Sequence, residues 1–174
     1  MSTIYEVRYA SHPEDAKAYD TARLRKEFLI EKLFETGKIL LTYSMYDRYM
    51  VGGAVPVDGG LKLETIDPLK AEYFCERREM GIINVGSSGR IIVDGTNYPL
   101  GFKEALYIGR GSREVVFESD KVGQPARFYI NSAPAHKEYP TTKVTLADAD
   151  VAVMGSLEGS NHRQINKLLV NTVV

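Results

Sequence analysis

The chain has 174 residues, of which 44% are hydrophobic and 26% charged, and its net charge is −1. This length and composition are typical of one globular domain, and the near-neutral charge argues against nucleic-acid or membrane-surface partners. The single cysteine, Cys75, argues against a disulfide framework, and no apolar run reaches the roughly 20 residues of a membrane span, so we expect a cytoplasmic protein.

Residues 1–20 are polar and are predicted to form an extended lead-in, without the basic cap and apolar run of a signal peptide. Residues 21–34 have the apolar spacing of a short helix with one buried face. The apolar positions are Leu24, Phe28, Leu29, Leu33 and Phe34. Asp20 or Thr21 can cap the start of this helix, and Gly37 can end it.

From residue 38 the pattern changes to short apolar runs separated by glycine-rich turns, which is typical of strands. The predicted strands lie within 39–46, 73–75, 81–85, 90–93, 105–108, 114–118 and 126–131. Asp94-Gly95 predicts a tight hairpin turn. Many short strands without helices between them indicate a sandwich or barrel and exclude an alternating α/β fold.

Two spacings match the motifs of a cupin barrel. Glu79 is followed by six residues and then Gly86, as in the first motif. Gly101 opens the second motif, in which Tyr107 replaces a proline and Ser112 replaces a histidine. We therefore expect a mainly β fold, a cupin-type jelly-roll β-barrel with a short N-terminal helix.

The residues that hold a metal in cupins are replaced in this chain. The usual His-x-His pair falls on residues 72 and 74 or 73 and 75, which are Glu72, Phe74, Tyr73 and Cys75. Neither option supplies two imidazoles, and Ser112 is a poor zinc or iron ligand. The histidines of the chain are His12, His136 and His162, none at a cupin ligand position. We predict no metal ligand in this barrel.

Several segments, in order, resemble the 5-keto-4-deoxyuronate isomerase family, also called 4-deoxy-L-threo-5-hexosulose-uronate ketol-isomerase. They are residues 24–34, 46–48, 51–53, 74–79, 91–95, 105–109, 113–117, 133–136 and 163–167. The resemblance implies the amino-terminal half of a bicupin, a hexameric enzyme of pectin and uronate breakdown. It also implies zinc in a second barrel, held by ligands downstream of this chain.

The reaction implied by the resemblance interconverts 5-dehydro-4-deoxy-D-glucuronate and 3-deoxy-D-glycero-2,5-hexodiulosonate, with catalysis outside this chain. The alternative is a metal-free cupin module for sugar-acid binding or subunit interaction. The predicted layout is a lead-in at 1–20, a degenerate metal-free barrel at 21–155, and a linker with the start of a second cupin domain at 156–174. The chain stops at two apolar residues, Val173 and Val174, for which no burial partner is evident. We therefore also expect that sequence is missing after them.

The sequence identifies no catalytic residue. Three residues, Arg77, Arg78 and His136, are candidates for binding the substrate. Arg77 and Arg78 lead into Glu79, and one of them can point into the barrel because neighbouring strand residues face opposite sides. An arginine binds a carboxylate through two parallel hydrogen bonds. The alternative is a structural ion pair with Glu76, Glu79 or a neighbouring subunit. His136 lies in a predicted loop. Arg48, beside Asp47, is interpreted as a surface or interface ion pair.

Overall fold

The computed structural model describes residues 3–174, which form thirteen strands, two α-helices and two short 3₁₀ helices. The first half contains β1 (Thr3–Arg8), α1 (Pro13–Ala16), α2 (Thr21–Phe28), β2 (Ile39–Ser44), β3 (Met50–Ala54), β4 (Leu61–Lys62), η1 (Asp67–Leu69), β5 (Arg78–Asn84) and β6 (Gly89–Val93). The second half contains β7 (Thr96–Leu100), β8 (Ala105–Ile108), β9 (Val115–Ser119), β10 (Phe128–Pro134), β11 (Thr142–Val144), η2 (Leu146–Asp148), β12 (Asp150–Met154) and β13 (Arg163–Lys167). No helix in this range is long and apolar enough to cross a membrane.

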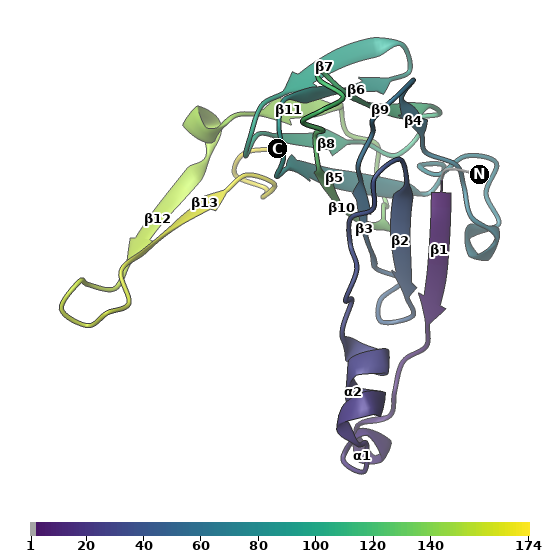
Figure 1. Cartoon of the computed structure of the whole chain (residues 1–174), viewed down its shortest axis with the longest axis vertical. Coiled ribbons are helices and arrows are strands. Elements are labelled where there is room, and N and C mark those ends of the chain that lie inside the picture. Colours follow the sequence, from purple (N-terminus) through teal and green to yellow (C-terminus); the bar gives the residue numbers. More distant parts are fainter. Residues whose placement is uncertain (1–2) are drawn as a thin grey trace.

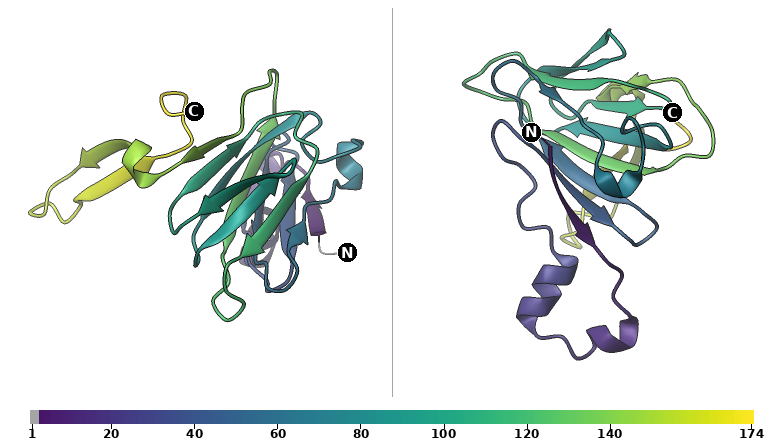
Figure 2. Two further views of the ribbon diagram at one scale, coloured as in Figure 1. Left: turned by 90° about the horizontal axis from the view of Figure 1, so that it is seen from above. Right: turned by 90° about the vertical axis from the view of Figure 1, so that its right-hand side faces the viewer.

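Two sheets form the body of the molecule (Figure 1). The larger has seven strands in the order β1-β2-β3-β10-β5-β8-β11, and the smaller has four in the order β4-β9-β6-β7. All pairings are antiparallel except that of β1 with β2. Figure 2 shows the two sheets from two further sides. The prediction of a mainly β, jelly-roll fold is confirmed.

The space between the sheets is filled by apolar side chains. Alternate residues of β5, among them Met80 and Ile82, face inward and are fully buried, as expected from the pleat of a strand. Phe117 of the smaller sheet packs on Phe128 of the larger one, with ring centroids 5.5 Å apart. The interior is therefore a packed core.

The hairpin predicted at Asp94-Gly95 is confirmed. Asp94 has φ 48° and Gly95 has φ 80°, the left-handed conformations that a tight turn between β6 and β7 requires. The Asp94 carboxylate also accepts hydrogen bonds from the backbone N–H groups of Arg113 and Glu114. This turn therefore ties the loop between β8 and β9 to the smaller sheet.

The N-terminal helix is shorter than predicted. Asp20 caps α2 as expected, accepting a hydrogen bond from the Arg23 N–H at 2.8 Å. The helix ends at Phe28 because Leu29 adopts an extended conformation, with ψ 126°, well before Gly37. No residue of α2 is buried, and Figure 1 shows α1 and α2 standing away from both sheets. The prediction of one buried face is wrong.

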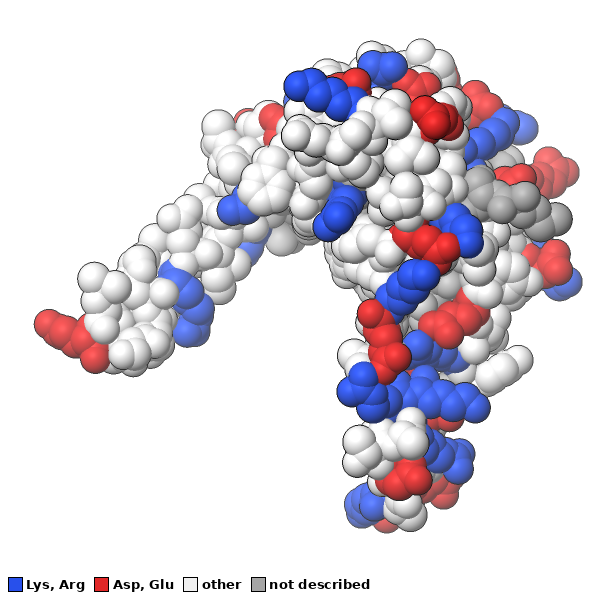
Figure 3. Space-filling view, viewed as in Figure 1, with Lys and Arg blue, Asp and Glu red and all other residues white. Residues whose placement is uncertain are grey.

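Charged side chains cover the arm formed by α1, α2 and the residues up to Glu35. Figure 3 shows Lys and Arg alternating with Asp and Glu along it. They pair locally, as in the contacts Lys17–Glu14, Arg25–Glu31 and Lys32–Glu35. The charged side chains thus pair with near neighbours in the sequence, and Leu24 and Phe28 of α2 remain exposed.

Two other predicted segments differ in the structure. Thr3–Arg8, within the expected lead-in, is an edge strand of the larger sheet, paired with β2. Residues 73–75, expected as a strand, form a turn in which Phe74 and Cys75 are buried in the core. This turn belongs to the segment that crosses from the smaller to the larger sheet. Its apolar residues close the end of the barrel instead of alternating along a strand.

A second arm is formed by β12 and β13, which pair with each other and project from the body (Figure 1). The boundary predicted between residues 155 and 156 lies in the turn of this hairpin; the division into domains remains a prediction. Val173 packs with Ala105, Val144 and Leu168. The interpretation that the terminal valines have nothing to pack against is therefore wrong for Val173.

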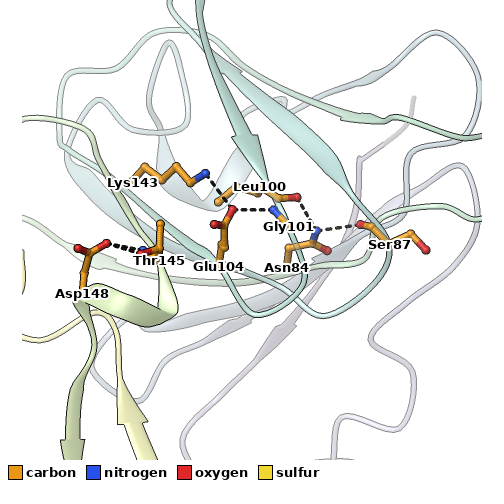
Figure 4. A network of polar contacts seen from close by, with 8 residues as sticks. All are labelled: Asn84, Ser87, Leu100, Gly101, Glu104, Lys143, Thr145 and Asp148. Carbon is orange, nitrogen blue, oxygen red and sulfur yellow. Dashed lines mark hydrogen bonds and ion pairs between the residues drawn. The ribbon is translucent and has the colours of Figure 1, made fainter.

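A network of polar contacts lies where β5 ends, at the other end of this strand from Arg78. Figure 4 shows these contacts. The Asn84 side chain, with no exposed surface, donates to the carbonyls of Ser87 and Leu100 at 2.8 and 2.9 Å. Glu104 accepts from the Gly101 N–H at 2.7 Å and from the Lys143 ammonium at 2.9 Å. These contacts join the end of β5 to the end of β7, and the loop that follows β7 to β11.

The Glu104 contacts predict acid sensitivity. The hydrogen bond from Lys143 lowers the pKa of Glu104, so this carboxyl stabilises the fold above its unfolded-state pKa and loses that contribution as the pH falls through its folded-state pKa. We expect Glu104→Gln to lower stability at pH 7 by up to about 1 kcal/mol and to weaken the fall in Tm on acidification. Thermal unfolding of both proteins from neutral to acidic pH measures this. Parallel Tm curves would contradict it.

Candidate binding site at the barrel mouth

The barrel mouth is defined here as the end of the barrel where β2 and β10 end and β5 begins. Arg78, the first residue of β5, pairs in register with Pro134, the last residue of β10. A pocket of about 240 Å³ lies at this end. Its lining residues are Tyr43, Arg48, Pro68, Leu69, Ala71, Phe74, Arg77, Arg78 and Pro134.

Arg78 forms the inner wall of the pocket. Its side chain points inward like Met80, and the residue is 4% exposed. Its Nε donates to Ser132 Oγ at 3.1 Å, and its Nη2 donates to the carbonyls of Ser132 and Arg48 at 2.9 and 2.8 Å. Within residues 3–174 it makes no ion pair, so the buried positive charge has no anionic partner in the described chain.

The burial of the Arg78 guanidinium has an energetic cost that a bound anion can offset. Its guanidinium carbon lies 5.7 Å from the centre of the Tyr43 ring, and burial lowers its pKa. An arginine nevertheless stays charged at neutral pH because the ordinary pKa of its guanidinium lies far above neutrality. A buried cation without a counter-charge is costly. A bound carboxylate would therefore offset a cost that the fold already carries.

Arg77 and Arg48 add positive charge at the rim. Arg77 is exposed; its Nη2 donates to the Leu69 carbonyl at 2.8 Å, and its Nε lies 4.0 Å from Glu76. Arg48 lies in the turn between β2 and β3, with φ 54°. No Asp or Glu is among the residues that line the pocket. The site can therefore bind an anion through arginines from two separate segments.

The structure brings two of the three candidate binding residues to this pocket. Arg77 and Arg78 lie at one pocket, with Arg78 inside and Arg77 outside, as the alternation of strand residues predicts. His136 is exposed and does not line the pocket. Arg48 was missed: within the described residues it makes no ion pair with Asp47, and it contributes to the pocket instead. Only the pairing of distant strands brings it there.

The described residues do not form a zinc site. At the expected ligand positions Phe74 and Cys75 are core residues, and no group of three His, Cys, Asp or Glu among residues 3–174 is arranged to hold a metal. Glu79 points to the outer face of the larger sheet, where it accepts a hydrogen bond from the Tyr107 hydroxyl at 2.7 Å. Of the alternative ion pairs, Arg77 lies near Glu76, and within residues 3–174 Glu79 pairs with neither Arg77 nor Arg78.

Cys75 is expected to be unreactive in the folded protein. The residue is 1% exposed, and burial raises the pKa of its thiol to about 12, so almost no thiolate forms at pH 8. A chromogenic thiol reagent should react with the native chain at least about 100-fold more slowly than with the urea-unfolded chain. Equal rates in the two states would show that Cys75 is accessible.

Comparisons with known proteins identify the family. The model of the KduI/IolB family matches residues 29–174. The chain is 60% identical over 174 residues to the 4-deoxy-L-threo-5-hexosulose-uronate ketol-isomerase of Bacteroides fragilis and 57% identical to that of Formosa agariphila. Each match covers 100% of this chain and 62% of the relative, so the chain spans less than two thirds of their length.

A solved structure shares the fold. It is an IolB-like protein from Salmonella typhimurium, with a TM-score of 0.50 and 13% identity, which covers 68% of this chain and 42% of that one. At this identity the likeness supports the architecture alone. The resemblance noted in the sequence is confirmed by the family match and by the named relatives: this chain belongs to the KduI/IolB family.

Proposed function

We propose that the chain works as part of a ketol-isomerase acting on a deoxyuronate, interconverting 5-dehydro-4-deoxy-D-glucuronate and 3-deoxy-D-glycero-2,5-hexodiulosonate. The observation that carries this proposal is the 60% identity to a named ketol-isomerase over all 174 residues. A setting in uronate or pectin breakdown, a cytoplasmic location and a homo-oligomeric, hexameric assembly belong to the same proposal.

We assign to this chain the binding of a sugar-acid carboxylate rather than the chemical step. The barrel mouth provides Arg48, Arg77 and Arg78 around one pocket without a lining carboxylate. Guanidinium groups match the planar, two-oxygen geometry of a carboxylate, and one held in place by packing loses little entropy on binding. Arg78 is held in this way by Ser132 and the Arg48 carbonyl.

The proton transfer requires groups that are not among the described residues lining the barrel-mouth pocket. An isomerisation between neighbouring carbons needs a base beside the substrate and a group that stabilises the developing oxyanion. The barrel-mouth pocket is lined by arginines and apolar or aromatic residues. We propose that the zinc of the whole enzyme is held by residues outside this chain.

The test replaces the matching segment of the Bacteroides fragilis relative with this chain. Conversion of 5-dehydro-4-deoxy-D-glucuronate is followed by NMR, with the chain alone measured in parallel. We expect the chimera to convert the substrate and the chain alone to bind it without conversion. A folded chimera that binds the substrate but does not convert it would contradict the isomerase proposal.

A further inference from the structure

A second pocket lies on the outer face of the larger sheet, on the opposite side from the core. It has a volume of about 630 Å³. Its floor is formed by β5, β8 and β10, and its walls by residues 139–142 and the last residues of the chain. The C-terminus lies beside these strands (Figure 1). None of the lining residues belongs to the barrel mouth.

One carboxylate is held in position in this pocket. Glu79 accepts a hydrogen bond from the Tyr107 hydroxyl at 2.7 Å. Burial, and then the hydrogen bond to Glu79, raise the pKa of Tyr107, so the phenol remains protonated and keeps donating. An ionised carboxylate offers about four acceptor sites, and Tyr107 uses one of them. Glu79 can therefore accept further hydrogen bonds from a ligand.

The remaining lining is aromatic, apolar or neutral. Tyr49 and Tyr139 are 40% and 53% exposed and line the pocket together with Tyr107. Asn131 also lines it, and within residues 3–174 its amide makes no hydrogen bond. Its donors and acceptor are available to a ligand. Aromatic faces with a few positioned polar groups are typical of small-molecule sites.

Close packing shapes the pocket floor. A Cβ on Gly81 would lie 2.5 Å from Leu169 Cδ1 and 2.7 Å from Asn131 Oδ1, so both side chains lie directly against the strand at Gly81. A Cβ on Gly109 would lie 1.9 Å from the Tyr139 carbonyl oxygen, which fixes the Tyr139 backbone against β8. The pocket is therefore built from packed segments.

The charge of the lining selects the ligand class. No Lys or Arg is among the described residues that line the pocket, whereas Glu79 is. A uronate carboxylate would meet a like charge there, and a like-charge contact is unfavourable. A sugar hydroxyl, by contrast, can donate to Glu79 and accept from Asn131, while the apolar face of a sugar ring packs on tyrosine.

We propose that this outer-face pocket is a separate binding site for a neutral monosaccharide, with Glu79 as the hydroxyl acceptor and Tyr107 as the residue that positions it. The chain then carries two sites of opposite preference, the barrel mouth for acidic sugars and the outer face for neutral ones.

The test uses matched sugar pairs that differ only at C6: D-galactose with D-galacturonate, and D-glucose with D-glucuronate. The isotope-labelled chain is titrated with each sugar and followed by amide NMR. We expect a neutral sugar to shift the amides of residues 79–81, 131, 139, 141 and 142, and its acid to bind there about tenfold more weakly or not at all. No shift of these amides at tens of millimolar neutral sugar would overturn the proposal.

Two variants separate a ligand role from a structural one. Glu79→Gln keeps the size of the side chain, so it should weaken the neutral sugar about tenfold and bring the affinities of the neutral sugar and its acid together. Tyr107→Phe should weaken the neutral sugar less and keep the preference over the acid. An unchanged preference of Glu79→Gln for the neutral sugar over its acid would overturn the proposal. Binding of the cationic amino sugar D-galactosamine, but of neither neutral sugar, would also overturn it. If the sugar acids do not bind at the barrel mouth, this result contradicts the carboxylate-binding role under the proposed function and leaves the outer-face site unaffected.

Discussion

Replacing Arg78 with methionine is expected to destabilise the chain by about 3 kcal/mol, a fall in Tm of about 10 °C for a protein of this size. The guanidinium donates to three oxygens, Ser132 Oγ and the carbonyls of Ser132 and Arg48. Methionine fills similar volume but donates nothing, so buried acceptors lose their partner. Denaturant unfolding followed by circular dichroism measures the loss.

Arg77→Met is the matched control for this prediction. The two arginines are neighbours, but the Arg77 side chain is 55% exposed, so solvent can replace its contacts. We expect it to cost less than about 1 kcal/mol. Equal losses of stability in the two variants would contradict the assignment of Arg78 as the buried member of the pair.

Replacing Asn84 with alanine is expected to cost about 2–4 kcal/mol. The Asn84 amide donates to the carbonyls of Ser87 and Leu100, and its oxygen accepts from the Gly86 N–H at 3.0 Å. Alanine leaves these backbone groups buried without the partner that satisfies them, and it also opens a cavity. The loss is measured by denaturant unfolding at pH 7.

The matched control is Asn131→Ala on the neighbouring strand β10. Asn131 faces the outer pocket and, within residues 3–174, its side chain makes no hydrogen bond. We expect a change of less than about 1 kcal/mol. If Asn131→Ala proved as damaging as Asn84→Ala, the loss in Asn84→Ala could not be attributed to the buried hydrogen bonds.

Local patterns predicted the elements that depend on local chemistry. The Asp94-Gly95 turn follows from two residues that tolerate positive φ, and the Asp20 cap follows from one side chain. Apolar runs located most strands because burial between two sheets requires such runs. The predictions for α2 were wrong in two respects: the helix ends at Phe28, and none of its residues is buried. The apolar spacing predicted a buried face, whereas the helix is exposed to solvent and its charged residues pair locally.

The sites depend on contacts that no local pattern contains. Arg77 and Arg78 could be proposed because they are adjacent in a segment predicted to be extended, in which neighbouring residues face opposite sides. Arg48 could not, because only the register of β3, β10 and β5 brings its turn to the same pocket. Motif spacing placed Glu79 at a cupin ligand position, yet the pleat directs it outward toward Tyr107.

A calorimetric titration of D-galacturonate into the chain tests the assignment of the barrel mouth as a sugar-acid site most directly. The same titration is made with the double variant Arg48→Gln, Arg77→Gln, which leaves the buried Arg78 in place. We expect the unmodified chain to bind the acid at the barrel mouth, more weakly as salt is added, and the double variant to bind it at least about tenfold more weakly. Equal affinity in the two proteins, or no binding by a folded wild-type chain, would contradict the assignment of the arginine pocket as a sugar-acid site.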